Sequence, residues 1–264
     1  MVKMVKAFQA IVRDGKALSE THLEAFNRDG YIILKGLLCP KEIERIKSCR
    51  DRAEARAGEE GGSFMEGVAH FDLEPLGGDE SSGEFALRKV QEAYQVDEDF
   101  RHVTASDKIL DVVEDLIGPD IYYFSSKLMC KPAQGGRRKP WHQDYAYWEG
   151  MNTKQVTVWS AIDHATTENG CMQLIPGSHR RGLIPHHQLE DYMIDEAGIE
   201  NENILTAEMD AGDVLFFNVL TLHASGPNHS HAPRLSAIID FDSKPKPRKE
   251  LPFGSETPLR STSA

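Results

Sequence analysis

The sequence has few cysteines and no long apolar run. Its four cysteines are spread over 264 residues without a CxxC pair, which argues against a zinc knuckle or a disulfide framework. We expect reduced, buried thiols. No stretch approaches the roughly 18 apolar residues that a membrane helix needs, and the N-terminus lacks an apolar core with a small-residue cleavage site. The sequence therefore predicts a cytoplasmic protein with no membrane partner.

Positive charge is also scarce. The 30 Lys and Arg residues stand against 42 Asp and Glu residues, which gives a formal net charge of −12 at pH 7. Nucleic acids bind proteins that present a positive field, so we expect no nucleic-acid partner. The motifs GxSxG, GxxxxGK[ST] and GxGxxG are absent as well. The sequence therefore lacks the motifs that these nucleophilic and nucleotide-dependent mechanisms need.

The first 120 residues show mostly helical patterns. Thr21 and Ser106 are predicted to cap two helices, and a buried strand is predicted at 31–34. Stretches rich in Gly, Glu and Ser at 58–62 and 77–84 predict mobile surface loops. The predicted helices share regular apolar spacing and cover 18–30, 40–57 and 106–118.

After residue 120 the pattern changes to short β-rich runs separated by turn residues. Helices followed by closely spaced strands predict a mainly β fold with flanking helices. We expect one domain over 1–264, with a helical part at 1–120, a β core at 121–242 and a covering or partly disordered tail at 243–264. A helical insertion is predicted at about 186–197. The predicted strands are 121–131, 155–162, 171–175, 204–209, 213–218 and 234–241.

A metal-binding pattern lies in Trp141-His142-Gln143-Asp144. On a strand, residues two apart point to the same face, so His142 and Asp144 would bind one metal together. A later apolar strand end supplies His223 as a third candidate ligand. Two histidines and one carboxylate leave open coordination positions, as in non-haem iron(II) oxygenases. The alternative is a strand-end His142 that is merely hydrogen-bonded to Asp144, since the chain has eleven histidines.

One arginine leads into an apolar strand near the end of the core. Arg234 follows His223 by eleven residues and precedes the apolar run 235–239. Burying a guanidinium is unfavourable unless it is paired, and a carboxylate matches it in a bidentate fork. A dicarboxylate cosubstrate would be such a partner. A surface position or an internal salt bridge is the alternative.

In combination and order, these motifs resemble the phytanoyl-CoA dioxygenase family over most of the chain. The resemblance implies a double-stranded β-helix (jelly-roll, cupin-like) fold and an Fe(II)- and 2-oxoglutarate-dependent dioxygenase. Such an enzyme uses O₂, hydroxylates a small molecule and releases succinate and CO₂. Asp144 is the ligand that halogenating relatives lack, so hydroxylation is favoured over halogenation, whereas desaturation, epoxidation and cyclisation stay open. The motifs are His142-Gln-Asp144, the loop from Asn169-Gly170 to Pro176-Gly177-Ser178-His179, His223-x-Ser225-Gly226 with Arg234, and Phe26-x-x-Asp29-Gly30-Tyr31.

The same resemblance assigns roles within the site. Plain core packing is the alternative for Trp159, and a solvated strand face is the alternative for Lys127. The implied iron ligands are His142, Asp144 and His223. The implied cosubstrate contacts are Arg234, Ser225, Trp159 and Lys127.

The substrate is expected to be a small molecule with an anionic group. Lys127, Lys131 and the basic run 137–139 come before the metal motif, and aromatic residues follow it. The alternative is that 137–139 is a solvated loop, which is the usual place of a charge run. Candidate substrate contacts are Ser125, Met129, Arg138, Tyr145 and Tyr147.

Two other classes stay open at this point. A cupin-type enzyme that works without 2-oxoglutarate would need the metal ligands but not Arg234. A non-catalytic relative would keep the fold and lose the reaction. We expect a monomer or a homodimer.

Overall fold

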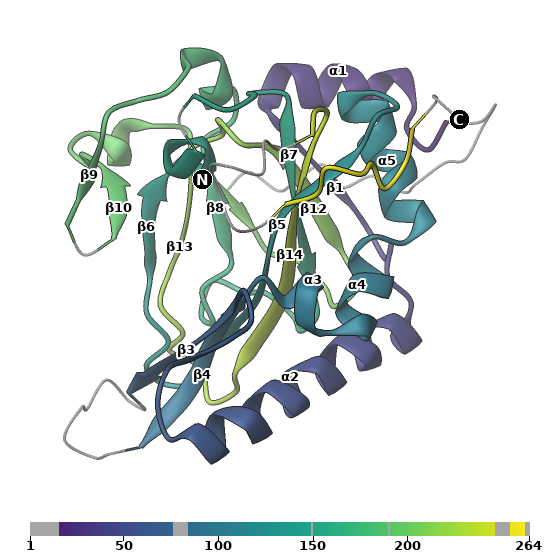
Figure 1. Cartoon of the computed structure of the whole chain (residues 1–264). Helices are drawn as coiled ribbons and strands as arrows, with labels where there is room; N and C mark the ends of the chain where they lie inside the picture. Colours follow the sequence, from purple (N-terminus) through teal and green to yellow (C-terminus); the bar gives the residue numbers. More distant parts are fainter. Residues whose placement is uncertain (1–15, 76–83, 149, 190, 246–253, 262–264) are drawn as a thin grey trace.

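Two antiparallel sheets form the centre of the molecule, and helices cover the larger one (Figure 1). The computed structural model describes residues 16–75, 84–148, 150–189, 191–245 and 254–261. In spatial order, the larger sheet contains β1 (Tyr31–Leu34), β12 (Val214–Asn218), β7 (Gln155–Ala161), β14 (Arg234–Asp242), β5 (Tyr122–Lys131), β4 (Phe85–Gln91), β3 (Ala69–Pro75) and β2 (Phe64–Glu66). The smaller sheet contains β11 (Leu205–Ala207), β8 (Met172–Leu174), β13 (His223–Ser225) and β6 (Lys139–His142).

From β5 onward the chain passes back and forth between the two sheets. β5, β7, β12 and β14 lie in the larger sheet, whereas β6, β8, β11 and β13 lie in the smaller one. With antiparallel pairing throughout, this winding is that of a double-stranded β-helix. The predicted fold class, mainly β with flanking helices around a jelly-roll core, is confirmed.

The two faces of the larger sheet pack into different cores. In β7, Val158 packs against the helices, and the next residue, Trp159, packs between the sheets. This follows from the alternation of side chains along a strand. Strands buried on both faces read as apolar runs, as β12 does over 214–217; β7 is also buried throughout, but Gln155, Thr157 and Ser160 interrupt its apolar residues. Their burial also places Trp159 toward the interior of the jelly roll.

The helices lie on the outer face of the larger sheet (Figure 1). Each contributes an apolar stripe; in α5, for example, Ile109, Val113 and Ile117 are buried. Gly30 and Gly61 end the first two helices in the left-handed region, at φ 82° and 69°, where a residue without Cβ is favoured. The helices are α1 (Glu20–Asp29), α2 (Pro40–Glu60), α3 (Ala93–Val96), α4 (Glu98–Thr104) and α5 (Asp107–Ile117).

The N-terminal part is less helical than predicted. Strands β2, β3 and β4 extend the larger sheet there. They were not predicted because their sequences are short and interrupted by charged residues, so no clear period of apolar residues is present. The predicted loop at 58–62 is wrong in its first half, because α2 continues to Glu60. In the other predicted loop, 77–84, residues 77–83 lie outside the described residues.

Three local predictions are wrong. Ser19, not Thr21, caps α1: its Oγ accepts from the His22 backbone N–H, and His22 Nδ1 accepts from the Ser19 N–H. Cys39 is exposed, although the other three cysteines are buried as expected. The predicted helical insertion at 186–197 is a hairpin, β9 (His186–Gln188) and β10 (Tyr192–Ile194), because pairing across a short turn satisfies its backbone.

The described part of the C-terminal tail covers the start of the core. Ile121 forms an isolated bridge with Arg260, and Leu259 packs against the helix-covered core. The rest of the tail, 246–253 and 262–264, lies outside the described residues. Among the helices that the structure describes, none is long and apolar enough to cross a membrane.

Candidate metal centre

Three buried side chains from the smaller sheet and its edge converge on one point. His142 ends β6, His223 begins β13, and the two residues are register partners. Nε2 of His142 lies 3.5 Å, and Nε2 of His223 lies 3.7 Å, from Oδ1 of Asp144. One ligand atom from each residue lies within 4.8 Å of the other two. The arrangement matches the two-histidine, one-carboxylate set that the sequence predicts.

The local geometry around Asp144 differs from the prediction. The strand ends at His142, and Asp144 opens a short 3₁₀ helix, η3 (Asp144–Trp148). The two side chains therefore do not share a strand face. The turn from β6 into η3 brings the carboxylate beside the imidazole instead.

Both imidazoles have their Nε2 atoms available for a metal. Nδ1 of His142 donates to the Pro140 carbonyl and Nδ1 of His223 donates to the Thr221 carbonyl, each at 2.9 Å. A carbonyl can only accept, so these contacts fix the tautomer and leave a lone pair on each Nε2. Oδ2 of Asp144 accepts from the Thr157 hydroxyl at 3.0 Å, which leaves Oδ1 facing the imidazoles.

The electrostatics of the three groups favour a cation. Burial lowers the pKa of His223 to about 3, with repulsion from His142 as the second cause, and burial also lowers the pKa of His142. Burial alone would raise the pKa of Asp144, but His223 and His142 outweigh it and bring that pKa below its usual range. At neutral pH the set is two neutral imidazoles and one carboxylate, which suits a divalent ion such as Fe(II).

The three candidate ligands line a cavity of about 870 Å³ that Arg234 also reaches. Arg234 is 2% exposed, and its Nη1 donates to the Gly170 carbonyl at 2.9 Å. Its Nε has no hydrogen-bond partner among the described residues, and no described carboxylate lies within salt-bridge distance. Burial lowers the pKa of Arg234 to about 10, so it remains charged at pH 7. An unpaired buried guanidinium is costly unless a ligand supplies the anion.

Most of the other predicted site residues face the same cavity. Trp159 lies under the guanidinium of Arg234, with 5.2 Å between the ring centroid and Cζ. Tyr145 does not line the cavity: its hydroxyl donates to the Met151 carbonyl and its ring packs in a small core cluster. Lys131 donates to the Gly226 carbonyl and is also absent from the cavity wall. The predicted residues that line the cavity are Ser125, Lys127, Met129, Arg138, Tyr147, Trp159, Ser225 and Arg234.

The cavity wall includes residues that the sequence did not single out. Arg88, Lys89 and Gln91 come from β4, a strand that was not predicted, so nothing in the sequence argument pointed to them. Thr157 lies two residues before Trp159 on β7 and therefore shares its face. The two-residue spacing from Trp159 could therefore have predicted Thr157 as a cavity residue.

A double-stranded β-helix that gathers two histidines, one aspartate and a buried arginine around one cavity defines the class of Fe(II)- and 2-oxoglutarate-dependent oxygenases. The sequence profile of the phytanoyl-CoA dioxygenase (PhyH) family matches residues 26–236. The chain belongs to this family. It is an Fe(II)- and 2-oxoglutarate-dependent dioxygenase.

Individual relatives agree with this assignment. Peroxisomal phytanoyl-CoA dioxygenase of Bos taurus is 28% identical over 251 residues, which cover 87% of this chain and 70% of the relative. Ectoine dioxygenase of Sphingopyxis alaskensis is 27% identical over 262 residues, covering 91% and 81%. The crystal structure of EctD from S. alaskensis with 2-oxoglutarate and 5-hydroxyectoine has a TM-score of 0.72 at 22% identity, covering 96% of this chain and 90% of that one.

Proposed function

We propose that this enzyme hydroxylates a small molecule that carries an anionic group. The main support for 2-oxoglutarate binding is Arg234, which is buried and unpaired in the same cavity as the three converging side chains. In the proposed site His142, Asp144 and His223 hold Fe(II), and Arg234 with Ser225 binds the distal carboxylate of 2-oxoglutarate. When bound, Fe(II) and 2-oxoglutarate supply the oxidising chemistry with O₂, and the cosubstrate leaves as succinate and CO₂.

The protein's own contribution is binding, orientation and the exclusion of water. Trp159 packs against the guanidinium of Arg234 and restricts its orientation. The Pro140 and Thr221 carbonyls hold both imidazoles in the metal-binding tautomer. The Thr157 hydroxyl holds one oxygen of Asp144 and turns the other toward the imidazoles. These contacts preorganise the site before any ligand enters.

Support for an anionic substrate comes from Lys127. It lines the cavity beside Asp144, and its Nζ lies 5.6 Å from the Trp148 ring centroid, but no described carboxylate lies within 4 Å. Burial lowers the pKa of Lys127, yet Asp240 and Asp144 outweigh burial and leave that pKa raised. Apart from Arg234, the other cations of the wall have carboxylate neighbours at 2.6–3.6 Å: Arg88, Lys89, Arg137, Arg138 and Lys139.

Lys127 and Arg234 both line the cavity but start from different points along their strands. Arg234 on β14 is the register partner of Lys131, which follows Lys127 by four residues on β5, or about 13 Å along the strand at roughly 3.3 Å per residue. The resemblance gives Lys127 to the cosubstrate, whereas its position beside Asp144 also suits a substrate anion. The substitution Lys127→Met separates these roles. We expect the substrate KM to rise about tenfold to a hundredfold, the range for a lost charged hydrogen bond, with 2-oxoglutarate affinity unchanged.

The experiment that tests the function is an anaerobic titration with Fe(II) and 2-oxoglutarate. The chelate should give a weak visible charge-transfer band, which reports the metal and the cosubstrate together. Substrate screening by succinate release would follow. If Fe(II) binds and no band forms, the cupin-type alternative without 2-oxoglutarate takes first place. A protein that consumes no 2-oxoglutarate with any substrate would be a non-catalytic relative.

The remaining predictions concern the setting of the enzyme. A cytoplasmic location, the absence of nucleic-acid partners, and a monomeric or homodimeric state stay predictions, as does the single domain over 1–264.

A further inference from the structure

The residue between two of the candidate metal ligands, Gln143, is completely buried and fully hydrogen-bonded. It is 0% exposed. Its Nε2 donates to the Gly182 carbonyl at 2.8 Å and to the Leu220 carbonyl at 2.7 Å, and its Oε1 accepts from the Ile184 N–H at 2.8 Å. A primary amide can satisfy all three contacts at once because it has two N–H donors and one acceptor oxygen.

These contacts join three segments that carry the site. Gln143 itself lies between His142 and Asp144. Leu220 lies in the turn that precedes His223, so one bond ties the first ligand segment to the second. Gly182 and Ile184 belong to an irregular stretch that leads into the β9–β10 hairpin, which contributes Gln188 and Asp191 to the cavity wall.

The backbone of Gln143 repeats this connection through His186. The Gln143 N–H donates to Nε2 of His186 at 3.0 Å, and Nδ1 of His186 donates to the Ile184 carbonyl at 2.7 Å. The Gln143 carbonyl accepts from the Ala146 N–H at 3.1 Å, within the turn that presents Asp144. The side chain and the backbone of Gln143 are therefore both hydrogen-bonded to residues other than the three candidate ligands.

We propose that Gln143 is a positioning residue that holds the two ligand segments in the geometry that binds the metal, with His186 as its partner. The physical reason is that the turn after β6 has no sheet pairing to fix it. Asp144 sits in a 3₁₀ turn, and the bonds of Gln143 act together with the Thr157 hydroxyl and with the Tyr145 N–H bond to the Val219 carbonyl to fix its direction. Partners that orient ligands typically change metal affinity about tenfold to a hundredfold when they are removed.

The test compares Gln143→Leu with Gln155→Leu. Gln155 is also 0% exposed and its Nε2 donates to Asp242 at 2.6 Å, but it lies outside the cavity wall. Both variants leave buried polar groups unpaired and should lower the melting temperature. Well below that temperature, the dissociation constant of Co(II) should rise about tenfold to a hundredfold in Gln143→Leu. In Gln155→Leu it should match the wild type.

A second pair keeps the test decisive if Gln143→Leu fails to fold. His186→Ala removes one hydrogen bond from the Gln143 backbone, and we expect the Co(II) dissociation constant to rise about twofold to tenfold. His187→Ala is the control, since His187 is exposed and adjacent in sequence. Equal Co(II) affinity in His186→Ala and His187→Ala, or in the two glutamine variants, would overturn the proposal. A wild-type protein that binds no Co(II) would instead contradict the metal site itself.

Discussion

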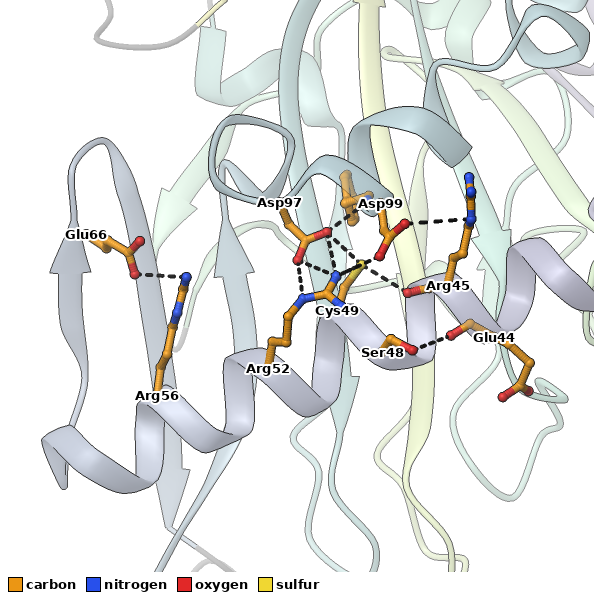
Figure 2. A network of polar contacts seen from close by, with 10 residues as sticks. Glu44, Arg45, Ser48, Cys49, Arg52, Arg56, Glu66, Asp97 and Asp99 are labelled. Atoms are coloured by element: carbon orange, nitrogen blue, oxygen red, sulfur yellow. Dashed lines mark hydrogen bonds and ion pairs between the residues drawn. The ribbon is translucent and has the colours of Figure 1, made fainter.

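Two polar clusters in this molecule differ in whether their charged groups have partners within the chain. The first, here the α2–α4 cluster, joins two helices through Arg45, Cys49, Arg52, Asp97 and Asp99 (Figure 2). Arg52 Nη2 lies 2.7 Å from Asp97 and 3.1 Å from Asp99, and the Cys49 thiol donates to Asp97 at 2.9 Å. Each charge in this cluster has its partner within the chain.

In the cavity, the corresponding partners are missing from the described residues. Arg234 is nearly inaccessible and donates to one backbone oxygen. The Nε2 atoms of His142 and His223 carry no proton and face the same oxygen of Asp144. Unpaired buried polar groups destabilise a fold, so they persist where a ligand completes them. Unsatisfied polarity, more than charge itself, therefore distinguishes the cavity from the α2–α4 cluster. We therefore expect cavity substitutions to change binding and cluster substitutions to change stability.

The largest effect is expected for His223→Ala. Without one of the three converging ligands, Fe(II) binding and 2-oxoglutarate turnover should fall to background, because the remaining pair holds the metal weakly. The stability of the metal-free protein should stay the same or increase, since a desolvated imidazole is removed beside His142. Succinate release and thermal unfolding without metal measure the two effects. Retained turnover would remove His223 from the ligand set.

The next effect is expected for Arg234→Ala. Losing the guanidinium should weaken 2-oxoglutarate binding by about 2–5 kcal/mol, which is more than about thirtyfold, while Fe(II) affinity is retained. Arg234→Lys should fall between Ala and the wild type, because an ammonium cannot form the bidentate fork. The anaerobic visible band, titrated with 2-oxoglutarate, gives the cosubstrate affinity, and a Co(II) titration without 2-oxoglutarate gives the metal affinity. Equal 2-oxoglutarate affinity in all three proteins would place the cosubstrate elsewhere.

The two clusters also differ in how far the sequence predicts them. His142, Asp144, His223 and Arg234 were predicted together because the combination and order of their motifs resemble the phytanoyl-CoA dioxygenase family. The HxD tripeptide or the arginine before a core strand would not have been enough alone. The α2–α4 cluster was not predicted, because ordinary charged residues on two helices carry no sign of which pairs meet.

The same distinction holds for the fold. Strands rich in β-branched and aromatic residues, such as β7 and β12, were predicted nearly to their ends. In contrast, β2 to β4 and the β9–β10 hairpin depend on pairing with distant segments or across a turn, and their sequences alone resemble helix or loop. Tyr145 shows the limit for side chains, since its neighbour Tyr147 lines the cavity while Tyr145 packs into a core cluster.

In the α2–α4 cluster, Asp97→Ala should lower the free energy of unfolding by about 1–3 kcal/mol. Asp97 accepts from the Phe100 N–H as the N-cap of α4 and pairs with Arg52, so alanine removes a cap and leaves a cation unpaired. Asp97→Asn keeps the cap and should lose less. Urea unfolding measures stability, and Co(II) affinity should match the wild type in both variants. Weakened Co(II) binding would contradict the separation of the two regions.

The pH dependence of the same variants sharpens this prediction. Burial alone would raise the pKa of Asp97, but the Cys49 thiol, the Phe100 N–H and Arg52 outweigh it and lower that pKa from 3.8. A carboxyl with a lowered folded-state pKa stabilises fully above its ordinary value, and that stabilisation is lost as the pH falls through the lowered pKa. The stability difference between wild type and Asp97→Asn should be constant from pH 7 to 5 and shrink below about pH 4. A difference that shrinks already above pH 5 would argue against the ion pair.

The smallest effect is expected at the edge of Figure 2, where Arg56 reaches from α2 to Glu66 on β2. The pair is 2.9 Å long, but its side chains are 43% and 44% exposed. Water screens such a pair, and ordering two long side chains opposes it, so Arg56→Ala should change the free energy of unfolding by about 0–1 kcal/mol. The Arg52–Asp97 pair, at 2.7 Å, should stabilise the fold more, because Asp97 is 17% exposed and satisfies a helix end as well. Urea unfolding of Arg56→Ala and Asp97→Ala measures the loss in free energy of unfolding for each variant. Equal losses would contradict the expectation that burial and helix capping make the Arg52–Asp97 contact the stronger one.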